Sequence, residues 1–74
     1  MKIGAIVKEY RKKEGLTMEE FATKIGRSKG YISMLEKGEN PNTHKPIAPT
    51  FETLKKIAKA MDLDITVLIQ KIEV

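Results

Sequence analysis

The stretch that decides the fold is residues 17–37, TMEEFATKIGRSKGYISMLEK. Its apolar residues recur at intervals of three and four on both sides of Gly26, which is typical of two short amphipathic helices. Thr17 and Glu20 have the spacing of a capping box that starts the first helix, and Ser28 is a natural N-cap for the second. Gly26 supplies the positive φ that a tight turn between them needs. The stretch therefore predicts two helices joined at a fixed angle.

The residues outside this stretch also have helical periodicity, and no segment of useful length alternates with the period of a strand. Residues 2–14 predict one more helix, residues 50–61 a second that is capped by Thr50, and residues 64–74 a third that is capped by Asp64. Residues 39–49 contain all three prolines and are expected to be irregular. The expected inward-facing residues of the three outer helices are Ile3, Ile6, Val7 and Tyr10; Phe51, Leu54, Ile57, Ala58 and Met61; and Ile65, Leu68, Ile69 and Ile72.

The length of the chain bounds what it can form. Seventy-four residues make one domain at most, so we expect a single all-α domain over residues 1–74, built as a five-helix bundle. A chain this short buries a small core and has little room for an enclosed substrate pocket. It has no Cys nucleophile, no supported Ser/His/acid arrangement and no phosphate-cradling glycine loop, so we expect no enzyme activity.

The composition points to a class of partner and to a compartment. The 14 Lys and Arg against 10 Asp and Glu give a formal charge of +4 and a pI near 9.4. A basic small domain is typical of nucleic-acid binding, although an ordinary solvated surface gives the same balance. The absence of cysteine fits a reducing compartment such as a bacterial cytoplasm, and with a single His it argues against a structural zinc site. No apolar run approaches the ~20 residues that a membrane span needs, and charge interrupts residues 1–8 too soon for a signal peptide.

Two helices joined by a glycine-containing turn are the generic helix-turn-helix unit. Here the motif, at about residues 17–37, resembles that of the phage repressor and Cro family, also called the xenobiotic-response-element family. The resemblance rests on GLTMEEFA at 15–22, IGRS at 25–28 and YISMLEKG at 31–38. It continues through residues 50–61 and 65–68, which look like the fourth and fifth helices of that family. It implies a phage-repressor-like domain that reads duplex DNA with its third helix in the major groove.

The resemblance also implies a set of DNA-contacting residues. The start of the recognition helix carries them, and Lys29 is suited to donate to guanine O6 or N7. For Tyr31 the alternative is partly buried packing, and for Met34 it is a cover over the core. Phosphate contacts are expected from the start of the second helix and from basic or polar residues near the third. The full expected set is Thr17, Met18, Arg27, Ser28, Lys29, Gly30, Tyr31, Ser33, Met34, Lys37 and Asn40.

The sequence departs from the family pattern at three of these positions and in one loop. The family usually has a phosphate-clamping Gln at the position of Met18, an apolar residue at Arg27, and a side chain at Gly30. Residues 39–49 are roughly half a dozen residues longer than the usual connection; their polar members are either phosphate contacts or a solvated loop. Those members are Asn40, Asn42, Thr43, His44 and Lys45, of which the lone histidine is given no catalytic or metal role.

Two structural pairings follow from the resemblance. Arg11 and Glu36 match an ion pair that joins the first helix to the third; the alternative is two unrelated surface charges. Val67 and Val74 fall outside the apolar stripe of the last helix and are expected to form a homodimer contact; the alternative is two single exposed apolar residues.

Together these observations predict a cytoplasmic, sequence-specific transcriptional regulator that binds double-stranded DNA as a homodimer on a near-palindromic operator. They imply no cofactor, no metal, no small-molecule site and no membrane association. The alternative is a helical protein-interaction module, or an antitoxin-like partner, that has kept the fold with weak or no specific DNA binding.

Overall fold

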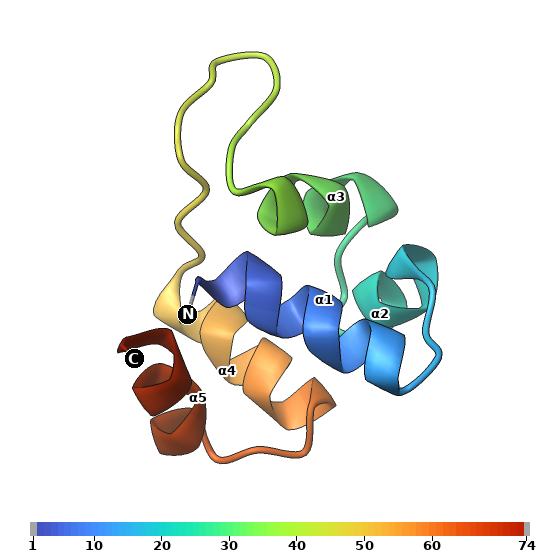
Figure 1. The fold of residues 1–74 in the computed structure, drawn as a ribbon, viewed down its shortest axis with the longest axis vertical. Coiled ribbons are helices and arrows are strands. Elements are labelled where there is room, and N and C mark those ends of the chain that lie inside the picture. The colour runs from blue at the N-terminus through green and yellow to red at the C-terminus, as the bar shows by residue number, and fades with distance from the viewer. Residues whose placement is uncertain (1, 74) are drawn as a thin grey trace.

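Five α-helices and no strand are found within residues 2–73, the part of the chain that the computed structural model describes. In Figure 1, α1 lies between α3 on one side and α4 with α5 on the other. This arrangement confirms the expected all-α fold, and the helix ends fall within one or two residues of those predicted. The helices are α1 (Ile3–Lys13), α2 (Met18–Lys24), α3 (Lys29–Lys37), α4 (Phe51–Ala60) and α5 (Ile65–Glu73).

Side chains from the residues just before α2, α3, α4 and α5 fix where these helices begin. At α2 the capping box is complete: the Glu20 N–H donates to Thr17 Oγ1 at 3.0 Å, and the Thr17 N–H donates to Glu20 Oε1 at 2.8 Å. The bond from the Thr17 N–H to the carboxylate lowers the pKa of Glu20. The other caps accept in the same way, Ser28 from the Tyr31 N–H, Thr50 from the Thr53 N–H and Asp64 from the Thr66 N–H.

One backbone motif ends three of the helices, α1, α2 and α4. A residue with positive φ follows the last turn, and the next N–H donates to a carbonyl five residues earlier, at 2.8–2.9 Å. This motif turns the chain sharply and satisfies carbonyls that the helix leaves unpaired. The positive-φ residue and the donor that follows it are Gly15 and Leu16 after α1, Gly26 and Arg27 after α2, and Asp62 and Leu63 after α4.

The core draws on all five helices and matches the predicted stripes with one clear exception. Phe51 was expected to face inward, but its side chain is 56% exposed and the Lys55 ammonium lies 5.5 Å from its ring centroid. The buried residues of α4 are Thr53, Ile57 and Ala58, and at ~100° per residue Phe51 lies nearly on the face of Ala58. Phe51 is the first residue of the helix, so its exposure reflects its place at the end of α4 and not the face that it shares. Ile69 is likewise only half-buried. The buried core residues are Ile6, Val7, Phe21, Ala22, Ile25, Ile32, Leu35, Ile57, Ala58, Met61 and Leu68.

Gly4 marks the closest approach of α1 to α3. A Cβ added there would overlap the Leu35 carbonyl oxygen and would lie 3.1 Å from the Cα of Glu36. Only a residue without a side chain therefore fits between the two backbones. The periodicity of the sequence gave Gly4 no role, because nothing local distinguishes it from an ordinary helical glycine.

We expect Gly4→Ala to destabilise the domain, because the new methyl group must push α3 away from α1. Overpacking of this kind typically lowers the free energy of unfolding by about 1–3 kcal/mol. Gly30→Ala is the matched control: its Cβ would meet only Ser28 Oγ at 3.8 Å, and replacing a helical glycine should add about 0.5–1 kcal/mol. Urea unfolding of both variants measures the difference. Equal effects of the two substitutions would contradict the close contact.

Candidate nucleic-acid interface

The helix-turn-helix unit is α2, the turn at residues 25–28, and α3. Four side chains, Phe21, Ile25, Ile32 and Leu35, lock the two helices together and are almost completely buried. Ala22 is buried in the same contact. Because the core fixes the angle between the helices, the exposed start of α3 is presented as a rigid element.

The expected DNA-contacting residues fall into two groups by exposure. Those at the start of α3 are exposed, which leaves their backbone and side chains accessible to a large ligand. The residues one turn further along α3 are half-buried, and Tyr31 packs against the core while keeping part of its surface exposed. Exposed are Thr17, Arg27, Ser28, Lys29, Gly30 and Lys37; half-buried are Met18, Tyr31, Ser33, Met34 and Asn40.

Arg27 makes contacts within the domain. Its Nη2 donates to Thr53 Oγ1 in α4 at 3.1 Å, and its guanidinium carbon lies 4.6 Å from the centroid of the Tyr31 ring. Sequence reasoning assigned no role to Thr53, which is 3% exposed. The only feature of the sequence that could have indicated such a role is that Thr53 is a second threonine, three residues after the Thr50 cap.

Arg11 and Glu36 join α1 to α3 through a two-pronged ion pair. Arg11 Nε donates to Glu36 Oε2 at 2.8 Å and Nη2 donates to Oε1 at 3.0 Å, while Nη1 donates to the Leu16 carbonyl at 3.1 Å. The side chains of Arg11 and Glu36 are 13% and 5% exposed. The hydrogen bond to Glu36 raises the pKa of Arg11, against the effect of burial. All three guanidinium nitrogens therefore have a partner within the domain.

Residues 39–46 form a finger that projects beyond the C-terminal end of α3 (Figure 1). An isolated antiparallel bridge between Glu39 and Pro46 closes its base, and the Asn40 N–H donates to the Lys45 carbonyl at 2.9 Å. At the tip, Asn40 Oδ1 accepts from the Asn42 N–H at 2.8 Å and His44 adopts a φ of 57°. The irregular segment expected from the prolines is thus a turn with its own hydrogen bonds.

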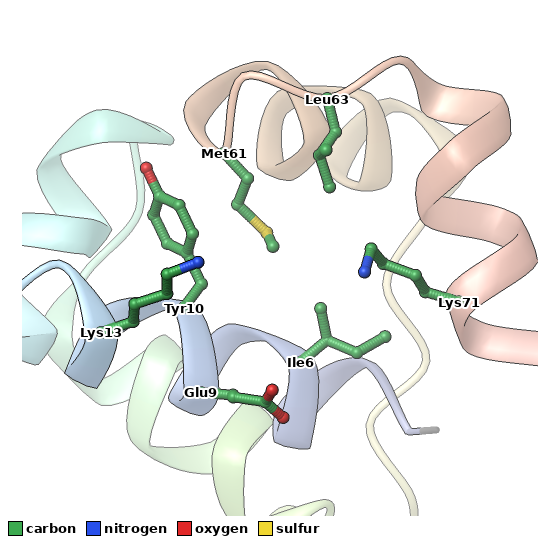
Figure 2. A pocket seen from close by; sticks show the side chains of 7 residues that line it. All are labelled: Ile6, Glu9, Tyr10, Lys13, Met61, Leu63 and Lys71. Carbon is green, nitrogen blue, oxygen red and sulfur yellow. The ribbon is translucent and has the colours of Figure 1, made fainter.

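An open hollow of about 280 Å³ lies between α1, the turn after α4, and α5. Figure 2 shows Ile6 and Met61 facing it beside Lys13 and Lys71. None of the residues that line it belongs to the expected DNA-contacting set. The hollow is therefore a feature of the α1–α5 junction, separate from the helix-turn-helix.

Residues 2–73 show neither a metal site nor a membrane span. No group of three His, Asp or Glu side chains there lies close enough together to hold a metal ion. None of the helices in the same range combines the length and the apolar character that crossing a bilayer requires.

The protein family described as Helix-turn-helix matches residues 7–68, which is most of the chain. The chain belongs to the helix-turn-helix family. The match spans α2, α3 and α4, most of α1 and the first four residues of α5, so the family resemblance drawn from the sequence is confirmed.

Relatives within the helix-turn-helix family are bacterial and phage regulators. SlrR, a helix-turn-helix-type transcriptional regulator of Bacillus subtilis (strain 168), is 33% identical over 66 residues, covering 89% of this chain and 40% of SlrR. The ImmF control region 10 kDa protein of Bacillus phage phi105 is 36% identical over 67 residues, covering 90% of this chain and 67% of that protein. This chain therefore spans well under half of the length of SlrR. The names of these relatives agree with the expectation that the chain is a regulator and not an enzyme.

A solved structure shares the fold. The crystal structure of SinR, the master regulator for biofilm formation, in complex with DNA, superposes with a TM-score of 0.71 at 30% identity. The superposition covers 90% of this chain and 97% of the SinR chain. The five helices are therefore arranged as they are in a helix-turn-helix protein that was solved on DNA.

We expect Glu36→Ala to lower the free energy of unfolding by about 3–5 kcal/mol, because it leaves the Arg11 guanidinium buried without its counter-charge. Thermal and urea unfolding measure the loss. Glu9→Ala, which removes an exposed carboxylate from α1, is the matched control and should stay within about 0.5 kcal/mol of the parent. A melting temperature for Glu36→Ala within a degree of the parent's would show that the pair adds nothing to stability.

Proposed function

We propose that this domain binds double-stranded DNA sequence-specifically and regulates transcription, with α3 in the major groove. The observation that carries the proposal is the exposed start of α3, residues 28–30, held on a buried α2–α3 angle. A major groove about 12 Å wide admits one α-helix. The likeness to the DNA-bound SinR structure supports the same use of the fold.

The residues of the proposed site divide into two tasks. Lys29 lies in the first turn of α3, where a side chain can reach base edges, and Tyr31 follows on the same helix. Lys37 and Asn40 lie at and beyond the other end of α3, and we assign them to the phosphate backbone. The half-buried Met18 offers its backbone N–H at the start of α2, where the helix dipole favours a phosphate.

We further propose that the protein pairs as a homodimer through α5, inside a bacterial or phage-infected cytoplasm. The supporting feature is Val67, which is 39% exposed although Leu68 beside it is fully buried. A twofold dimer needs a self-complementary patch, and it would set two recognition helices about 34 Å apart, one turn of duplex. The second residue expected in this contact, Val74, lies outside the described residues.

Base reading by Lys29 can be separated from backbone binding by Lys37. We expect Lys29→Ala to change the preference among duplexes by about 1–3 kcal/mol at one base pair, and Lys37→Ala to weaken binding to all duplexes alike. Selection of bound duplexes from a random pool gives the operator, and titrations at several salt concentrations give both quantities. Sequence-independent losses of equal size for the two variants would contradict the assignment. A shallow salt dependence for the parent would favour a protein-interaction module.

The dimer contact predicts a specific effect of Val67→Glu. The variant should keep the fold, because Val67 lies outside the core, but sedimentation should shift toward the monomer. Its affinity for a two-half-site operator should fall far more than its affinity for generic duplex. Thr66→Glu adds the same charge at the neighbouring exposed position and serves as the control. A parent that is monomeric at high concentration and binds one molecule per operator would show the proposal to be wrong.

A further inference from the structure

Arg27 occupies a position that is apolar at the other two helix ends of the same kind. In the motif that ends α1, α2 and α4, the donor of the long backbone hydrogen bond usually makes a hydrophobic contact with the preceding turn. Leu16 and Leu63 are the donors after α1 and α4, and both pack against the core. After α2 the donor is Arg27, whose N–H reaches the Ala22 carbonyl at 2.9 Å. Its backbone is therefore fixed while its side chain is directed elsewhere.

Two further contacts hold the Arg27 side chain, one with Thr53 in α4 and one with Tyr31 in α3. Thr53 Oγ1 accepts from Nη2 at 3.1 Å and is itself held 3.1 Å from Thr50 Oγ1 at the cap of α4. The guanidinium lies over the Tyr31 ring at 4.6 Å from the centroid, a distance typical of a cation–π contact. Tyr31 also packs against the core. Its side chain therefore contacts both the core and a guanidinium that α4 holds in place.

We infer that Arg27 is a specificity-determining positioning residue, which fixes the Tyr31 ring in the orientation that reads the DNA. This inference rests on the proposed function. A tyrosine on a helix surface has two free side-chain torsions, and fixing them before binding removes an entropy loss from recognition. Lysine cannot replace arginine here, because an ammonium lacks the planar face and the fork of donors.

The competing role for Arg27 is a direct phosphate contact, since the residue is exposed. The two roles predict different behaviour. A phosphate contact adds about 0.9 to the slope of log affinity against log salt and is largely blind to sequence. A positioning role changes discrimination at the base pair that Tyr31 reads and leaves that slope nearly unchanged.

The test uses the operator selected from a random pool and its single-base-pair variants, titrated at several salt concentrations. Arg27→Lys keeps the charge, and Thr53→Val keeps Arg27 but removes its anchor. We expect each to reduce discrimination at one base pair by about fivefold, the equivalent of one exposed cation–π contact, with the salt slope unchanged. Thr53→Ser retains the hydroxyl and should discriminate as the parent does. The Tyr31 ring protons should shift in NMR spectra of free Arg27→Lys and Thr53→Val, but not of Thr53→Ser.

Three results would overturn the inference. Full discrimination by Arg27→Lys, which alters only an exposed side chain, would show that the planar guanidinium is not needed. A salt slope reduced by about one in Arg27→Ala, with discrimination intact, would assign Arg27 to a phosphate. A parent that binds all duplexes equally would contradict the proposed function itself and the inference with it, whereas the first two results leave that function standing.

Discussion

The contact on which the rest of the structure depends is the close approach of α1 to α3 at Gly4. The Leu35 carbonyl and the Glu36 backbone lie where a side chain of α1 would otherwise be. Further along α1, the Arg11 guanidinium donates two hydrogen bonds to the Glu36 carboxylate. Both contacts act on the second half of α3. The first two residues of α3, Lys29 and Gly30, stay exposed, which is why a helix of nine residues can be firmly packed and still present an accessible end.

The two arginines near α3 have opposite kinds of partner. Arg11 has a buried carboxylate that neutralises it and a carbonyl that takes its remaining nitrogen, so its positive charge serves the fold. Arg27 has a hydroxyl and an aromatic ring, neither of which cancels its charge. The same residue type therefore supplies a structural ion pair at one end of α3 and a positive charge without a carboxylate partner among the described residues at the other. The α4 helix contacts the helix-turn-helix through the hydrogen bond between Thr53 and Arg27, although α4 lies outside that unit.

The features that the sequence predicted well are those with a local cause. The capping box of Thr17 and Glu20 and the positive φ of Gly26 follow from neighbours within a few residues, and the structure has both. Gly4 and Thr53 were missed because their roles arise from residues about thirty positions away in the chain. Phe51 was placed inward by a periodic pattern that does not say where along the helix the packing ends. Local chemistry thus predicts where helices begin and end, whereas tertiary packing decides which faces and which small residues matter.

Because the base of the finger is closed, the length of the finger has little effect on the stability of the domain. Gly38 and Ile47 are already joined by a hydrogen bond of 3.3 Å, and Glu39 pairs with Pro46 just beyond them. The chain enters and leaves the finger at nearly the same place. The distance between α3 and α4 therefore does not depend on how many residues the finger contains. The entropy of closing a flexible loop grows slowly, by about 0.6 kcal/mol for each doubling of its length. Insertions and deletions in this finger are therefore nearly neutral for folding, and evolution can vary its length and polar tip without redesigning the helices.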